Sequence, residues 1–131
     1  MVRFALLLLA CLGPGVVRAD ADFGKLYQFY SQAGGRDFSP ARGKQLWIAE
    51  RSGEGGEAIS CATCHGTDLR KPGRQQRTGK PIEPMAPSVN KERYADIEKV
   101  EKWFVRNCKQ VLGRECTAQE KGDVLRFLSQ L

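Results

Sequence analysis

The chain has 131 residues, a length typical of one domain, and a net charge of +6 from 21 Lys and Arg against 15 Asp and Glu. Acidic residues are interspersed with the basic ones everywhere except in one loop, so we do not expect a nucleic-acid-binding protein. There are five cysteines but a single histidine, which excludes any site built on two histidine ligands.

The first 19 residues are predicted to be a secretion signal. A basic residue, Arg3, precedes an uninterrupted apolar run over residues 4–12, and small side chains near Ala19 place the cleavage after that residue. The run is much shorter than the roughly 20 residues of a membrane-spanning helix. We therefore expect a periplasmic protein that is exported and not embedded in the membrane, with residues 20–131 forming its one domain.

A lipoprotein signal is the alternative for this segment. Cys11 would then be the acylated residue, but Leu9 stands where that pattern expects a small side chain. With Cys11 removed, four cysteines remain in the domain, a number that in an exported protein normally indicates two disulfides.

Two helices are predicted in the first part of the domain. Apolar residues at helical spacing between Phe23 and Tyr30 form the first, which the glycines at 34–35 end. Ser39 followed by Pro40 supplies an N-cap and a proline at the first helical position. This second helix is expected to run to about Arg51.

A long irregular segment, residues 66–95, follows and contains four of the six prolines. Such a segment should wrap around something, because long structureless loops are rare in small domains. A helical pattern returns after Asp96 and ends at Gly113, and Thr117 with Glu120 forms a capping box for the last helix. No alternating strand pattern is present, so the prediction is an all-α domain. The inward faces of these two helices are predicted to be Ile97, Val100, Trp103, Phe104 and Val111, then Val124, Leu125, Leu128 and Leu131.

The most specific motif is Cys61-Ala-Thr-Cys64-His65. Two thiols one helical turn apart can each add to a vinyl group of one porphyrin, and His65 then faces the iron as the proximal ligand. A thioredoxin-like redox pair would need a βαβ context, which the sequence does not show. A zinc site could recruit other cysteines, but adjacent ligands are unlike the usual zinc spacings. We therefore predict one covalently bound haem c.

The second and last helices are expected to cross. Gly43 and Trp47 lie one turn apart and would let a partner helix approach closely beside an aromatic ring, with Phe127 as its counterpart. This arrangement resembles the crossed helix pair of class I cytochromes c, with an additional N-terminal helix before it. Ordinary core packing is the alternative, and the two can hold together.

The two remaining cysteines flank a predicted turn. Gly113 reverses the chain between Cys108 and Cys116, which could bring the sulfur atoms to bonding distance. A structural disulfide is the simpler interpretation, and a redox-active disulfide beside the haem is the alternative.

The residue on the far side of the iron decides the function, and two candidates stand in the domain. Met85 is its only thioether, and an axial methionine suits electron transfer, but only 20 residues separate Met85 from His65. Asn107 extends the apolar stripe of its helix by one turn. A buried amide there needs a polar partner, which could be the iron, the backbone, water or a haem propionate.

A resemblance bears on this choice, and it covers residues 39–131. The sequence is similar to the SHP (sphaeroides haem protein) family of oxygen-binding cytochromes c. The resemblance implies that Asn107 is the distal ligand and that Cys108 and Cys116 form a disulfide. The blocks that carry it are the haem motif, Gln76-Arg77-Thr78-Gly79-Lys80, Pro84-Met85-Ala86-Pro87-Ser88, Val100-Glu101-Lys102-Trp103, Arg106-Asn107-Cys108, Gly113-Arg114-Glu115-Cys116-Thr117 and Glu120-Lys121.

The expected function is a cytochrome c with a redox-labile ligand. A hard amide oxygen tolerates Fe(III) better than Fe(II), so reduction should release Asn107 and open the site to O₂, NO or CO. Trp103 would cover the ring or line the distal pocket. A simple His/Met electron carrier using Met85 is the alternative, and whether the protein is a haem oxidoreductase acting on O₂ or NO stays open.

Redox partners are expected to dock at the acid-free basic loop. The resemblance implies a dihaem cytochrome c and a membrane cytochrome b as electron donors. The alternatives for the loop are pairing of its cations with the haem propionates and a solvated loop without a partner. The ring N–H of His65 is expected to donate to a backbone carbonyl of the proline-rich loop. The loop's cations are Arg70, Lys71, Arg74, Arg77 and Lys80.

Overall fold

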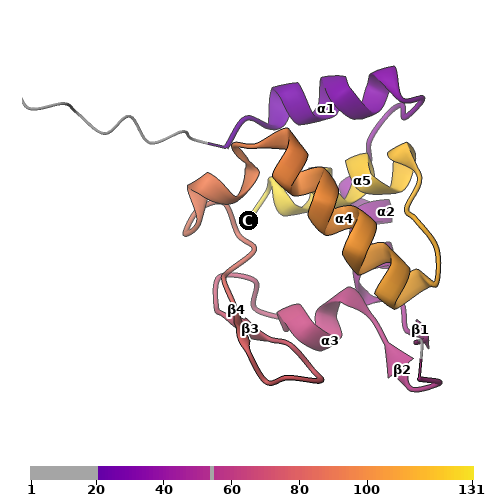
Figure 1. Cartoon of the computed structure of the whole chain (residues 1–131). Coiled ribbons are helices and arrows are strands. Elements are labelled where there is room, and N and C mark those ends of the chain that lie inside the picture. Colours follow the sequence, from indigo (N-terminus) through magenta and orange to yellow (C-terminus); the bar gives the residue numbers. More distant parts are fainter. Residues whose placement is uncertain (1–20, 54) are drawn as a thin grey trace, which may run out of the picture.

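The computed structural model describes residues 21–53 and 55–131, and the predicted secretion signal with Cys11 lies outside them. In these residues the predicted all-α architecture is confirmed (Figure 1). No helix among the described residues is long and apolar enough to cross a bilayer. The elements in chain order are α1 (Phe23–Gln32), α2 (Pro40–Ile48), β1 (Arg51–Ser52), β2 (Ala58–Ile59), α3 (Cys61–His65), β3 (Gly73–Arg74), β4 (Pro81–Ile82), the 3₁₀ helix η1 (Lys91–Tyr94), α4 (Ile97–Leu112) and α5 (Ala118–Leu128).

The helix ends follow the predicted caps. Asp96 accepts a hydrogen bond from the backbone N–H of Lys99 at the start of α4, and Gly113 ends that helix in the left-handed conformation, at φ 69°. Thr117 and Glu120 form the predicted capping box of α5. Each cap satisfies backbone groups that the helix leaves without a partner.

Helix α2 ends three residues earlier than predicted. Its N-cap, Ser39, is confirmed, but Ala49 adopts an extended backbone and Arg51 enters strand β1. The two short antiparallel pairs, β1 with β2 and β3 with β4, were not predicted from the sequence. Strands of two residues are too short to show the alternating pattern by which strands are recognised.

Helices α2 and α5 form the closest packing in the described part of the chain. A Cβ atom on Gly43 would lie 2.0 Å from the carbonyl oxygen of Asp123, so only glycine permits this approach. The rings of Trp47 and Phe127 lie 6.2 Å apart beside it, as expected for the crossed pair. Asp123 is itself buried and pairs with the guanidinium of Arg42, which ties α5 to the start of α2.

The segment 66–95 wraps around part of the core. Leu69 is buried in the main hydrophobic cluster, and its carbonyl accepts from the backbone N–H groups of Met85 and Ala86 at 3.0 and 2.9 Å. Tyr94 from η1 joins the same cluster and donates its hydroxyl to the carbonyl of Met85. The loop is therefore fixed by a few specific contacts in spite of its irregular backbone.

Candidate haem site

The attachment motif forms a single capped helical turn, α3. Ser60 and Thr63 make a reciprocal capping box, in which each side chain binds the other's backbone N–H. Gly66 ends the turn at φ 77°. Residues three apart on a helix share a face, so Cys61 and Cys64 lie one above the other, and both thiols are free. This is the geometry that attachment to two vinyl groups of one porphyrin requires.

The chain packs against the back of this turn without room for a side chain. A Cβ atom on Gly73 would lie 2.3 Å from the carbonyl oxygen of Cys64 and 2.8 Å from the Cα of His65. The β3–β4 hairpin is therefore pressed directly against the motif, and any larger residue at position 73 would push the two apart.

The buried imidazole of His65 favours its neutral form, in which it could bind an iron. Burial, with a smaller contribution from the charge of Arg93, lowers the pKa of His65 to about 4. The Nδ1 atom is buried without a hydrogen-bond partner among the described residues, so the expected bond to a backbone carbonyl is not found. The loop meets His65 through the Gly73 backbone beside its Cα, and the ring of Trp47 lies 5.2 Å from the imidazole.

The donor chemistry fits a covalent haem better than the other sites considered. Burial raises the pKa of the Cys61 thiol to about 11, which disfavours the thiolate that redox exchange or zinc binding needs. Within the described residues no three His, Cys, Asp or Glu side chains are grouped to hold a metal. The two thiols and the neutral imidazole are thus the groups that would hold the porphyrin, whose iron would bind His65.

Helix α4 carries the candidate distal residues. Asn107 is half-buried and stands next to Cys108, which is buried. Val100 and Val111 are buried as predicted, whereas Trp103 is 48% exposed and carries the guanidinium of Arg106 over its ring at 5.5 Å. Trp103 is therefore not part of the protein's own core, and its role in covering the haem ring or lining the distal pocket stays a prediction.

Cys108 and Cys116 are paired in the structure, with their Cα atoms 5.6 Å apart. Gly113 makes the intervening turn, and Cys116 directly precedes the N-cap of α5. The pairing therefore joins the end of α4 to the start of α5, one residue beyond Asn107.

Comparison with known proteins identifies the family. Residues 33–128 match a protein family that is described as a domain of unknown function, DUF1924. The chain is 40% identical over 129 residues, 98% of each chain, to the cytochrome c-type protein SHP of Cereibacter sphaeroides. The chain belongs to the SHP family of c-type cytochromes. Its cofactor is accordingly one covalently bound haem c.

Solved structures confirm the fold. The structure of oxidised SHP, described as an oxygen-binding cytochrome c, matches with a TM-score of 0.77 and 40% identity, covering 86% of this chain and 99% of that one. Oxidised cytochrome c'' from Methylophilus methylotrophus matches with a TM-score of 0.73 and 31% identity, covering 82% and 92%. The predicted cytochrome c-like fold is confirmed.

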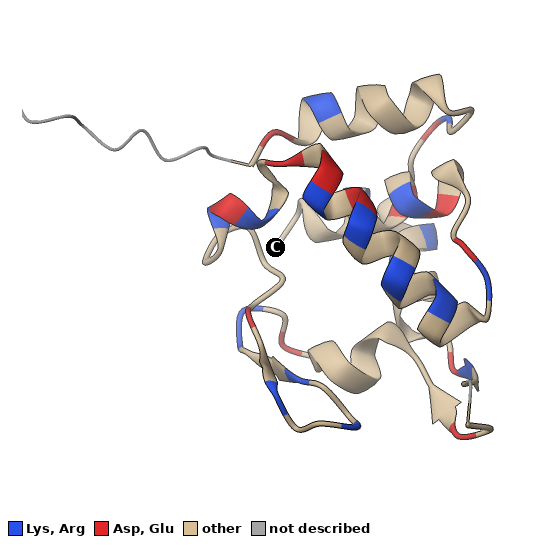
Figure 2. Cartoon of the chain, viewed as in Figure 1, with Lys and Arg blue, Asp and Glu red and all other residues tan. Residues whose placement is uncertain are grey.

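Two basic surfaces of this SHP-family protein lie on the β3–β4 region and on α4 (Figure 2). In the first, Lys71 pairs with Asp68 at 3.5 Å and Arg74 donates to the carbonyl of Gly79, so part of its charge is engaged. The second was not predicted, although its spacing of three and four residues along one helix would have shown it. Its exposed cations are Lys99, Lys102, Arg106 and Lys109.

A buried charge next to α4 was not predicted. Lys121 is 6% exposed and pairs with Glu101, which in turn accepts from the hydroxyl of Tyr30. The signal was present, because Lys121 lies four and seven residues before Leu125 and Leu128, on the inward face of α5.

Proposed function

We propose that this SHP-family protein is an exported gas-binding cytochrome c whose distal ligand, Asn107, holds the oxidised iron and leaves the reduced one. The oxygen binding described for the related SHP supports the gas-binding part. The observation that carries the ligand assignment is the half-buried position of Asn107 on α4, beside the Cys108–Cys116 pair.

Met85 is the competing candidate for the distal ligand, and its position in the structure argues against that role. The backbone of Met85 is held on both sides, by the carbonyl of Leu69 and by the hydroxyl of Tyr94. Its side chain packs against the main hydrophobic cluster. A thioether used in core packing would have to leave that packing to reach the iron, which costs burial energy.

The amide of Asn107 suits reversible ligation. A bound haem would supply an iron centre that takes up one electron and can bind O₂, NO or CO. The amide oxygen of Asn107 is a neutral hard donor, which favours the oxidised metal over the reduced one. Once released, the amide NH₂ of Asn107 can donate a hydrogen bond to a gas molecule held nearby.

The experiment compares Asn107→Ala with Met85→Leu in the holoprotein. We expect Asn107→Ala to convert the oxidised protein from a low-spin six-coordinate spectrum to a five-coordinate or water-bound one. Met85→Leu preserves side-chain volume and should leave that spectrum unchanged. An unchanged spectrum in Asn107→Ala, with a change in Met85→Leu, would identify the protein as the His/Met carrier instead.

We further propose that the Cys108–Cys116 pair is a disulfide formed after export to the periplasm. Disulfides form and persist in oxidising compartments, and the predicted signal at residues 1–19 directs the chain to one. Mass measurement of the secreted protein would test both points together. The mass should correspond to a chain that begins at Asp20, carries one haem and lacks two hydrogens at the cysteine pair.

We propose a dihaem cytochrome c or a membrane cytochrome b as the electron donor. The donor is expected to dock at the basic β3–β4 region. Arg77 and Lys80 are exposed and have no ion-pair partner among the described residues, so they can attract an acidic surface. Reversing both to Glu should slow reduction by a dihaem cytochrome c at low salt and flatten its salt dependence. Reversing Lys99 and Lys102 on α4 is the matched control, and a larger effect there would move the docking site to α4.

A further inference from the structure

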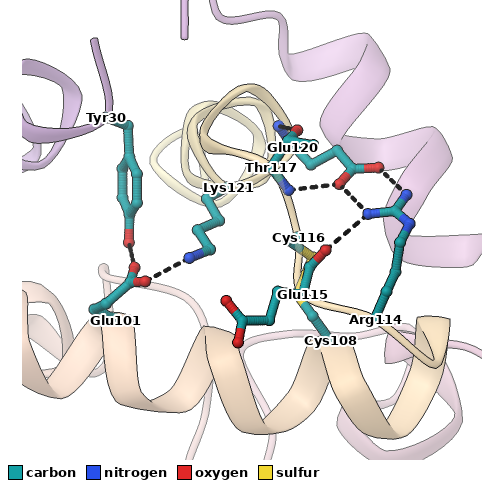
Figure 3. The surroundings of a disulfide bond; sticks show 9 residues. All are labelled: Tyr30, Glu101, Cys108, Arg114, Glu115, Cys116, Thr117, Glu120 and Lys121. Carbon is teal, nitrogen blue, oxygen red and sulfur yellow. Dashed lines mark hydrogen bonds and ion pairs between the residues drawn. A yellow bond between two sulfur atoms is a disulfide. The ribbon is translucent and has the colours of Figure 1, made fainter. Parts of the chain in front are cut away.

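One carboxylate ties helix α4 to two other helices. Glu101 accepts a hydrogen bond from the hydroxyl of Tyr30 in α1, at 2.7 Å on Oε2, and pairs through Oε1 with the ammonium of Lys121 in α5 (Figure 3). These partners lie 71 and 20 residues away along the chain. The three side chains, called here the Glu101 triad, therefore join α1, α4 and α5 at one point.

The two donor side chains of the triad are buried, whereas its carboxylate is partly exposed. Tyr30 is 2% exposed and Lys121 is 6% exposed, while about a third of the Glu101 side chain remains accessible. The Lys121 ammonium also lies 5.8 Å from the centre of the Tyr30 ring. A buried ammonium is costly unless it is paired, so removing the charge of Glu101 would leave Lys121 uncompensated.

Among the described residues, the backbone of α4 comes close to β1 and η1 and has fewer close approaches to the other helices. Its backbone approaches α1 and α5 much less closely than the backbones of α2 and α5 approach each other. The edge-to-face contact of Phe104 with Tyr30, at 6.1 Å between ring centres, adds packing at the same point. At the far end of α4 the Cys108–Cys116 pair forms the second attachment to α5. Asn107 lies between these two attachments, six residues after Glu101 and one before Cys108.

We infer that the Glu101 triad is a positioning device that holds α4 in the orientation from which Asn107 reaches the iron. This inference rests on the proposed role of Asn107 and assigns no contact between the triad and the haem. A weakened triad allows α4 to move away more often. The distal ligand then dissociates more often from the oxidised protein, in which it otherwise stays bound.

The test measures how fast cyanide binds to the oxidised holoprotein. Cyanide can occupy the distal position only after Asn107 has left, so its saturating binding rate reports that dissociation. Glu101→Gln removes the charge while keeping the size of the side chain, and we expect the rate to rise roughly tenfold. Tyr30→Phe removes one hydrogen bond only and should raise it roughly threefold, which also provides a result if Glu101→Gln does not fold.

A matched control separates positioning from loss of stability. Asp123 is also a buried carboxylate in an ion pair, with Arg42, but it joins α2 to α5. Its other hydrogen bonds are to Ser39 and Gln119, neither of which lies on α4. Asp123→Asn should therefore lower the free energy of unfolding and leave the cyanide rate within twofold of the unmodified protein. An equal acceleration in Asp123→Asn and Glu101→Gln would overturn the inference, because general loosening would then explain both.

A double substitution tests the link to the ligand. In an Asn107→Ala background no internal ligand remains to dissociate, so adding Glu101→Gln should leave the cyanide rate unchanged. A further acceleration in that background would show that the triad acts on something other than Asn107. If Asn107→Ala alone leaves the oxidised spectrum intact, the proposed function fails first. If only Glu101→Gln and Tyr30→Phe are without effect, the positioning role fails and the ligand assignment stands.

Discussion

Helices α3 and α4 hold their functional side chains in different ways. The α3 turn is fixed by neighbours in sequence, since its capping box spans residues 60–63 and Gly73 packs on it from eight residues beyond His65. Helix α4 is fixed at Glu101 by partners 71 and 20 residues away along the chain. At Cys108 it is fixed by Cys116, eight residues further on, just before the next helix. The proximal half of the site is thus a rigid local unit, and the distal half depends on side chains from other helices.

This difference matches the two tasks that we propose for the site. A covalently attached cofactor and its permanent ligand need a fixed platform, which tight backbone packing provides. A ligand that must leave and return needs an element that can shift by a small amount, and an element held by a few long side chains is suited to that. If so, substitutions should be able to perturb the two halves separately.

The largest effect is expected from the α3 cysteines. Replacing Cys61 and Cys64 by Ala removes both thioether bonds, so no haem should survive denaturation and acid extraction of the secreted protein. Replacing Cys108 and Cys116 by Ser is the matched control and should leave haem attachment complete. The two variants are compared by the haem stain of denatured protein. Retained pigment in the first variant would refute covalent attachment at α3.

On the proximal side, Gly73→Ala should lower the free energy of unfolding more than any other addition of one methyl group. The added Cβ would overlap the carbonyl of Cys64, so either the hairpin or the α3 turn must shift, at a cost of about 3 kcal/mol. Gly24→Ala, in α1 with no such contact, should leave the free energy of unfolding unchanged or raise it by up to about 1 kcal/mol. Denaturant unfolding of both holoproteins measures the difference, and equal stabilities would contradict the tight packing.

Loss of the distal cysteine pair should destabilise the protein without affecting attachment. A closed loop of this length contributes about 2.5 kcal/mol in the chain-entropy account, so Cys108→Ser with Cys116→Ser should lower the unfolding free energy by that amount. Urea unfolding with and without a reductant measures it. If a reductant lowers the stability of the unmodified protein and of the variant equally, the pair is not a disulfide.

The smallest effect is expected at the start of α5. Hydrogen bonds from Arg114 and from the backbone of Thr117 lower the pKa of Glu120 from 4.5 to about 2. The carboxylate therefore stabilises the fold fully at pH values above about 4.5, and this contribution is lost as the pH falls through about 2. Glu120→Gln should cost about 1 kcal/mol at pH 7. Thermal unfolding should show the difference shrinking between about pH 4.5 and pH 2 and vanishing below that, and a constant difference would exclude the charge as its cause.

The elements predicted correctly from the sequence are those defined by local signals. Ser39, Asp96, Gly113 and the capping box of α5 each act on backbone groups within a few residues, so the sequence alone locates them. The haem motif is equally local. The crossing of α2 and α5 was predictable because Gly43 leaves a gap that only a close neighbour would use.

The features that were missed depend on partners far along the chain. The burial of Lys121 could have been read from its place on the inward face of α5. Its pairing with Glu101, and that of Glu101 with Tyr30, depends on how α4 and α1 lie against α5, which no local pattern gives. The half-exposed ring of Trp103 likewise depends on how α4 is turned against its neighbours. Two-residue strands leave too little sequence to recognise, so β1 to β4 were absent from the prediction.

The central claim is that the distal position opens when the protein is reduced, and the absorption spectrum of the reduced holoprotein tests it most directly. We expect a high-spin spectrum that changes at once when CO is added, because Asn107 would have left the iron. A low-spin reduced spectrum that CO does not alter would contradict it. Such a result would show that a ligand stays bound in both oxidation states.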